Sequence, residues 1–313
     1  MNDCSTYLLE PVRFVPSMLV STTIVDTDQV WTAGTYDLAD VVIKEVVSTE
    51  DDSTKGMLVL RRWESLVAGN TGEPGVDADK WLNLGPADSV AAFDDRIGTV
   101  TRMPDDDPLV MIIAPGRQVS AIALFGVEGT SARVRVLNDS IVAYDETRYL
   151  ADQTISNWLE YFTEPIEQST SRLLLTGLPS YFYSQIEVTI TGHKPAVSLV
   201  SFGSLREIGS SPSHGAEAGT DDYSVKEVDG YGSKLVPLAT ADYQNLTLLV
   251  EKGRVNHVFR LLRRMVSMPV VLVASLDESY AEALVNYGWI GSHRFVFSYP
   301  THSVLDITFK GLT

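Results

Sequence analysis

The run from Trp63 to Gly75 constrains the fold more than any other part of the sequence. It reads Trp-Glu-Ser-Leu-Val-Ala-Gly-Asn-Thr-Gly-Glu-Pro-Gly. Three glycines and a proline fall within residues 69–75, so this segment can form neither a helix nor a central strand. The aromatic residues around it are held by turn residues instead of by helical periodicity. The pattern predicts a small, loop-rich β module.

We place this Trp-rich module at residues 26–86. Residues 41–46 and 56–60 are mostly apolar and predict two strands joined by a polar, acidic turn. The aromatic residues allow two interpretations. They form the core of a module too small to bury much else, or they are exposed and stack against sugar rings. Under the second interpretation, the glycan-binding candidates are Trp31, Tyr36, Trp63 and Trp81.

Residues 87–209 predict a β-sandwich. Short apolar or alternating segments follow one another between turn residues, which is the rhythm of two packed antiparallel sheets. Ala132, Val134 and Val136, for example, alternate with arginines, so one face of that strand points inward.

The N-terminal residues and a polar segment further along connect these parts. Pro11 and Pro16 indicate that residues 1–25 form an arm or an edge strand, because proline cannot donate to a sheet. The arm docks on a neighbouring subunit or packs on its own body, and the sequence favours neither. Residues 210–232 are rich in Gly, Ser and Asp and predict a linker loop.

Residues 233–313 predict a C-terminal α+β domain. Its first helix has one apolar side and is ended by Pro269, and the apolar strand 270–274 requires a helix to cover it. Residues 277–287 predict a second, short helix, and the alternation around Ile307 predicts a final strand. The apolar side of the first helix consists of Val255, Val258, Phe259, Leu262 and Val266. The predicted fold class is therefore mainly β, with a C-terminal α+β layer.

Residues 26–101 resemble a stretch found in structural proteins of tailed bacteriophages. The final residues, Phe309 to Thr313, are similar to the ends of the same proteins. The motifs that carry the resemblance are Trp31, Ala-Gly-Thr-Tyr at 33–36, Trp-Glu-Ser-Leu at 63–66, Gly-Asn-Thr-Gly at 69–72, Trp-Leu-Asn-Leu-Gly-Pro at 81–86 and the pair Phe93-Asp94. This resemblance implies a structural protein of the tail tip or baseplate.

Two weaker resemblances concern carbohydrate binding. The first half of residues 26–101 is similar to small chitin-type carbohydrate-binding modules, which hold sugars on exposed aromatic rings. The predicted sandwich resembles galactose-binding-like jelly rolls, and residues 157–162 would supply their return strand. These resemblances imply binding of host-surface glycans as an alternative function.

Composition excludes several kinds of partner. The chain has 24 basic and 41 acidic residues and a net charge of −17. Such a surface repels phosphate backbones and anionic lipid headgroups, so we expect no nucleic-acid partner and no membrane insertion. The acidity maintains solubility, or it delays association of an assembly subunit. A secretory pattern is lacking, which predicts synthesis in a cytoplasm. The phage resemblance implies that this is the host cytoplasm and that the chain resides in the virion tail.

Residue patterns for catalysis are absent from the sequence. It contains no dinucleotide-binding or phosphate-binding loop, no zinc-protease motif and no nucleophile elbow. The five histidines are scattered, the single cysteine excludes a cysteine-based zinc site, and Asp105 to Asp107 fit no known calcium loop. We therefore expect no enzyme, no cofactor and no metal. An enzyme that degrades polysaccharides has only the abundant carboxylates in its favour.

The sequence leads to one main expectation. The chain is a structural component of a phage tail that acts through subunit interfaces in a symmetric homo-oligomer, with other tail proteins as partners. Three arginines on the predicted helix form a basic face on an acidic protein and are the interface candidates. They are Arg260, Arg263 and Arg264.

Overall fold

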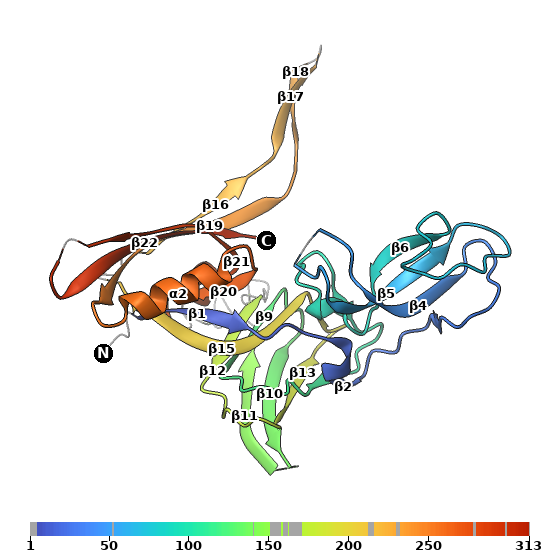
Figure 1. The fold of residues 1–313 in the computed structure, drawn as a ribbon, viewed down its shortest axis with the longest axis horizontal. Helices are drawn as coiled ribbons and strands as arrows, with labels where there is room; N and C mark the ends of the chain where they lie inside the picture. The colour runs from blue at the N-terminus through green and yellow to red at the C-terminus, as the bar shows by residue number, and fades with distance from the viewer. Residues whose placement is uncertain are drawn as a thin grey trace.

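The computed structural model describes residues 5–51, 53–139, 141–150, 158, 162, 171–211, 216–229, 232–277, 280–297 and 299–312. Within these ranges the chain is mainly β, as predicted. Figure 1 shows a body built from two sheets, the Trp-rich module extending from it on the right, and a long hairpin that projects upward.

The largest sheet has nine strands, in the order β12-β9-β15-β1-β20-β21-β22-β19-β16. It joins strands of the predicted sandwich to strands of the predicted C-terminal domain, so it crosses the expected boundary at residue 209. The strands are β1 Ser5–Pro11, β9 Ala121–Phe125, β12 Arg172–Thr176, β15 Leu199–Ser210, β16 Ala216–Asp222, β19 Thr240–Glu251, β20 Val270–Val273, β21 Val285–Val296 and β22 His302–Gly311.

A five-stranded sheet, ordered β11-β10-β13-β8-β2, packs against one end of the large sheet. The buried cluster between them combines Met111 and Val134 of the smaller sheet with Leu124 and Phe202 of the larger. This confirms the predicted sandwich. The strands of the smaller sheet are β2 Leu19–Thr22, β8 Leu109–Ile113, β10 Ser131–Asn138, β11 Ile141–Tyr149 and β13 Gln185–Thr191, and a short pair, β7 Thr101–Arg102 with β14 Ala196–Val197, lies beside them.

The expected return strand at 157–162 falls almost wholly outside the described residues. Trp158 and Phe162 are described, and both are helical and exposed. At these two positions the prediction of a strand is wrong.

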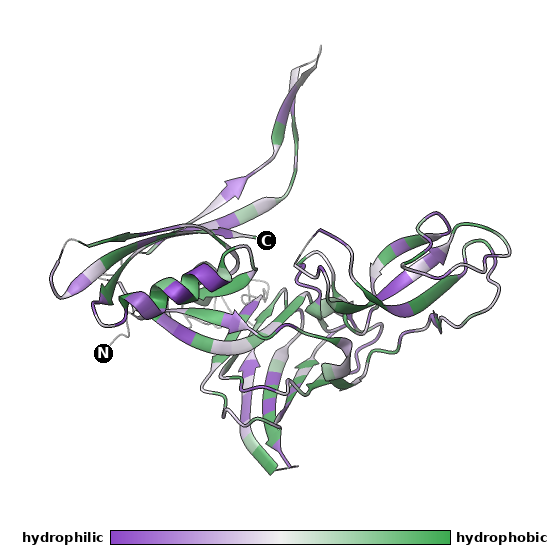
Figure 2. Cartoon of the chain, viewed as in Figure 1, coloured by the Kyte–Doolittle hydropathy of each residue, from purple (hydrophilic) through white to green (hydrophobic). Residues whose placement is uncertain are grey.

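Helix α2, Val255–Met265, covers the other end of the large sheet. Val258 and Leu262 are fully buried beneath it, against Leu272 of β20. Figure 2 shows the hydrophilic outer side of this helix in purple. The second predicted helix is much shorter, because α3 comprises only Ala281–Leu284. Tyr287 belongs instead to β21, since pairing with β20 and burial against Phe125 outweigh the local helical spacing.

The N-terminal arm packs on its own body. β1 pairs with β15 on one side and with β20 on the other, and Leu8 and Leu9 are fully buried. For β1 the expectation of an edge strand is therefore wrong, whereas β2, from the same N-terminal segment, does lie at the edge of the five-stranded sheet. Pro11 is tolerated because only Tyr7 to Leu9 pair on both sides, whereas Pro11 faces β15 alone. β1 and β15 approach so closely that a Cβ at Gly203 would lie 2.0 Å from the Glu10 carbonyl oxygen.

The Trp-rich module is a four-stranded sheet, ordered β3-β4-β5-β6. Its strands are β3 Gln29–Val30, β4 Val41–Val47, β5 Leu58–Ser65 and β6 Trp81–Pro86, and single turns of 3-10 helix, η1 Pro16–Met18 and η2 Ala91–Phe93, flank it in the sequence. The β4–β5 turn faces the body, since Glu50 in that turn accepts a hydrogen bond from Arg96 at 2.7 Å. The opposite end, residues 37–40 and 66–70, is therefore the distal tip of the module. Residues 73–76 fold back over the sheet, where Lys44 donates to Glu73 and Gly75 lies against Val46.

The predicted linker at 210–232 is largely strand, so that prediction is wrong. β16 pairs with β19 at the edge of the large sheet, and β17 Val225–Asp229 then pairs with β18 Gly232–Val236. We call residues 223–239 the hairpin arm (Figure 1). The composition of this segment is typical of a loop, because a two-stranded ribbon without a buried face can be formed by polar residues.

Candidate functional site

The aromatic residues of the Trp-rich module form its core. Tyr36, Trp63 and Trp81 are 7%, 8% and 2% exposed and pack together with Val42. The Trp81 indole donates a hydrogen bond to the Gly72 carbonyl at 3.0 Å, and its ring meets Tyr36 edge-on, with centroids 5.4 Å apart. Stacking on a sugar requires an exposed ring face. These three candidates therefore do not form the expected glycan platform.

Trp31, the fourth glycan-binding candidate, is half-buried and packs against the same core. The Lys44 ammonium lies 4.3 Å from the centre of its ring, a cation–π contact that occupies one face. Trp31 therefore also serves the internal structure of the module.

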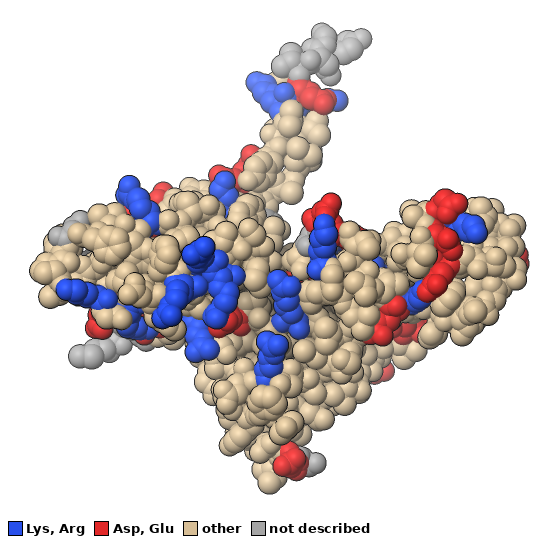
Figure 3. All heavy atoms as spheres, viewed as in Figure 1, with Lys and Arg blue, Asp and Glu red and all other residues tan. Residues whose placement is uncertain are grey.

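The three interface candidates lie exposed on one side of α2. Arg264 forms an ion pair with Glu10 of β1 at 2.6 Å, and the Arg260 guanidinium donates to the Asn256 carbonyl at 3.2 Å. Arg263, in the last turn, complements the negative end of the helix dipole. Figure 3 shows blue side chains gathered over α2 and beside it, on a molecule that is acidic as a whole.

A cavity of about 500 Å³ opens beside the C-terminal end of α2. Its lining combines basic and apolar side chains from segments far apart in the sequence, and we call it the arginine cavity. The residues that define it are Arg13, Arg117, Arg264, Met18, Met265 and Met268. Sequence reasoning missed Arg13 and Arg117, because neither belongs to a periodic pattern and only the fold brings them to Arg264.

Arginines without a carboxylate partner are confined to this surface. Within the described residues, the other arginines of the chain form ion pairs or hydrogen bonds with Asp or Glu. The exceptions are Arg13, Arg117, Arg260 and Arg263, for which the described part of the chain gives no ion pair. Two of these line the arginine cavity and two lie on α2 next to it. In a chain with a large excess of carboxylates, this concentration of arginines without an ion pair gives the surface a positive charge that complements acidic groups.

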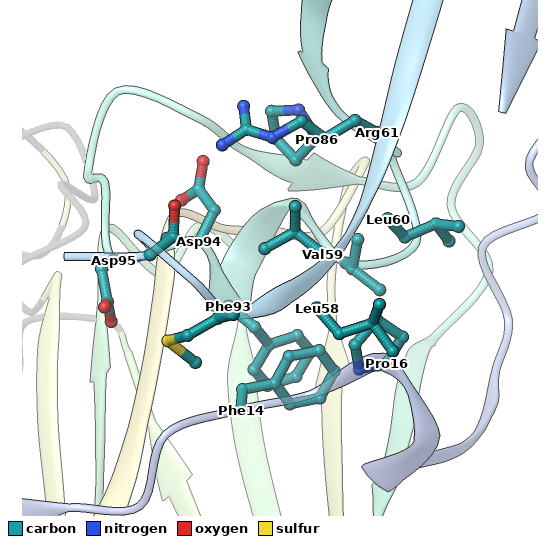
Figure 4. A pocket seen from close by; sticks show the side chains of 13 residues that line it. Phe14, Pro16, Leu58, Val59, Leu60, Arg61, Pro86, Phe93, Asp94 and Asp95 are labelled. Atoms are coloured by element: carbon teal, nitrogen blue, oxygen red, sulfur yellow. The ribbon is translucent and has the colours of Figure 1, made fainter. Parts of the chain in front are cut away.

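A second, small pocket lies where the module meets the body (Figure 4). The rings of Phe14 and Phe93 stack in it with centroids 4.3 Å apart, and its volume is about 40 Å³. Space of this size holds a few water molecules. The pocket is therefore a joint between the module and the body.

Asp94 lies at this joint with a perturbed pKa. Burial raises the pKa of its carboxyl from 3.8 to about 6, although Thr99 and Arg96 donate hydrogen bonds to it. Next to it, the buried Tyr287 hydroxyl donates to the Asp95 carbonyl at 3.2 Å and links β21 to the joint. Desolvation also raises the pKa of Tyr287.

We expect Asp94→Asn to change how stability depends on pH. The raised pKa gives the wild type a contribution to stability that is fully present below pH 3.8 and is lost as pH rises through about 6. The variant lacks this contribution, so its free energy of unfolding relative to wild type should increase by about 1–3 kcal/mol between pH 4 and pH 8. Urea titrations at both pH values measure this change. Parallel curves for the two proteins would show that Asp94 is not responsible.

The remaining sequence candidates form no site. Among the described residues, no group of three His, Cys, Asp or Glu side chains is placed to hold a metal. Asp105 accepts a hydrogen bond from the Asp107 backbone, as in a solvated turn, and Asp106 lies 2.8 Å from His193. No helix in the described part of the chain is long and apolar enough to cross a membrane.

Comparisons with known proteins give little beyond the fold class. No protein-family model and no curated protein matches the chain. Among solved structures, the crystal structure of SpGH29 is 15% identical over 36% of this chain and 23% of its own, with a TM-score of 0.25. A likeness at this level carries no argument about function. The protein is thus defined by its mainly β fold and by the surfaces described above.

Proposed function

We propose that this chain is a structural subunit of a bacteriophage tail, at the tail tip or baseplate, and that it acts through interfaces with copies of itself and with other tail proteins. The proposal joins the sequence resemblance to two features of the molecule. The aromatic residues of the module form its core. The hairpin arm and the arginine cavity remain exposed and are suited to contacts with other subunits.

The hairpin arm is the observation that carries this proposal. β17 and β18 pair only with each other, and an isolated two-stranded ribbon is marginally stable in water. The arm nevertheless exposes large apolar side chains. Monomeric proteins seldom expose several such side chains close together. These are Tyr223, Val225, Leu235 and Leu238, with exposed fractions of 56%, 49%, 66% and 53%. Burial of the arm against a neighbouring subunit would stabilise it.

Mass spectrometry of purified virions tests the proposal. We expect peptides of this chain in intact particles and in the isolated tail fraction, because a tail subunit is retained through purification. The lysate of infected cells is the control for synthesis. A chain that is abundant in the lysate but missing from tails would contradict the proposed function.

A further inference from the structure

The distal tip of the Trp-rich module has the chemistry that the arginine cavity lacks. Leu38 at the tip is 62% exposed. Asp37 and Asp40 flank it in the sequence. The tip thus offers an apolar side chain framed by negative charge.

The arginine cavity offers the reverse pattern. Its wall contains Met18, Met265 and Met268, whose flexible thioethers accommodate varied apolar shapes. Its lining also includes Arg13 and Arg117, which have no ion pair within the described chain. Glu10 is the one carboxylate in this lining, and it is shared between Arg206 and Arg264. The lining therefore combines methionines, which suit an apolar anchor, with guanidinium groups, which suit carboxylates.

The two surfaces cannot meet within one chain as it is folded here. The β4–β5 turn holds the near end of the module against the body, through the contact of Glu50 with Arg96. The distal tip consequently points away from the body, which carries the cavity (Figure 1). Contact between them requires two molecules.

We propose that the distal tip of one copy docks in the arginine cavity of a second copy. This inference rests on the proposed function and specifies its homo-oligomeric interface. Leu38 enters between the methionines, and the tip carboxylates Asp37 and Asp40 pair with Arg13 and Arg117. The contact is heterologous, since different surfaces of the two copies meet, and repetition produces a ring or a filament. The exposed Arg260 and Arg263 extend the attraction along α2.

Disulfide trapping between two tagged forms of the full chain tests this docking. Both forms carry Cys4→Ser; one adds Leu38→Cys and the other Met268→Cys. Mixing them under mild oxidation with copper phenanthroline should give the mixed cross-linked dimer as the main product. The matched control replaces Met268→Cys with Ile141→Cys, at a position on β11 that is 72% exposed. Equal cross-linking of both pairs, or cross-linking of neither, overturns the inference.

Charge reversal separates docking from random collision. Arg13→Glu with Arg117→Glu in the cavity partner should lower the mixed dimer yield by at least about tenfold, because the loss of even one close interfacial charge pair has an effect of this size. Asp37→Arg with Asp40→Arg in the tip partner should then restore it. Failure of this rescue, with both variants shown by circular dichroism to be folded, counts against the docking. Presence of the chain in virions is measured separately, so the proposed function can survive when this interface does not.

Discussion

Replacing Trp81 with alanine should lower the stability of the Trp-rich module by about 3–5 kcal/mol, the usual cost of removing a buried tryptophan. The side chain is 2% exposed, packs against Tyr36 and donates to the Gly72 carbonyl. Its loss opens a cavity and also leaves that carbonyl without its donor. Hydrogen exchange should therefore accelerate in β4, β5 and β6, while amides of the nine-stranded sheet keep their protection.

Leu82→Ala is the matched control for this substitution. Leu82 is the next residue on β6 but is 47% exposed, so its truncation should change stability by no more than about 0.5 kcal/mol. If Trp81→Ala leaves hydrogen exchange in the module unchanged, the indole does not stabilise the core. Glycan binding would then be the better interpretation of this residue. If exchange accelerates everywhere, the module and the body unfold as one unit.

Removal of the hairpin arm should abolish incorporation into tails without unfolding the body. Tyr223 and Ala239 face each other, with Tyr223 N–H donating to the Ala239 carbonyl at 3.3 Å. Replacing residues 224–238 with Asn-Gly connects Tyr223 to Ala239 through a two-residue β-turn. The described core clusters contain no residue from 217 to 245, so the melting temperature should stay close to that of wild type. Complementation of a phage that lacks the chain measures incorporation.

A milder variant shows which property of the arm matters. Leu235→Ser with Leu238→Ser keeps the ribbon but removes two of its exposed apolar side chains. We expect incorporation to fall below the wild-type level, because these two side chains would be buried against the neighbouring subunit. The pairing of β17 with β18 should remain unchanged. Wild-type incorporation of the truncated chain would show that the arm is not an assembly element.

Patterns in the sequence correctly predicted features that depend on residues close together in the chain. Alternation around Val134 placed a buried face correctly, and the helical spacing from Val255 located α2 almost to the residue. The same pattern put Phe259 on the buried side, although it is 46% exposed and contacts Phe295 at the edge of the core. The aromatic residues around Trp63 were correctly recognised as the centre of a compact module, with burial as one of two interpretations.

Contacts between distant segments were beyond the reach of sequence patterns. Nothing near β1 indicates that it lies between β15 and β20, because strand order depends on pairings across most of the chain. The arginine cavity is similar, since Arg13, Arg117 and Arg264 come from three separate segments. The hairpin arm was missed for another reason: a ribbon without a buried face needs none of the apolar alternation that identifies strands.

The position of β1 has a consequence for how the chain matures in the cell. Tyr7 pairs with Val273, so β1 has a neighbour that is synthesised long after it. At about 5–20 residues per second, that neighbour emerges roughly ten seconds or more after β1. The central sheet therefore closes only after β20 has left the ribosome, and a chain interrupted before that point lacks one neighbour of its strand β1.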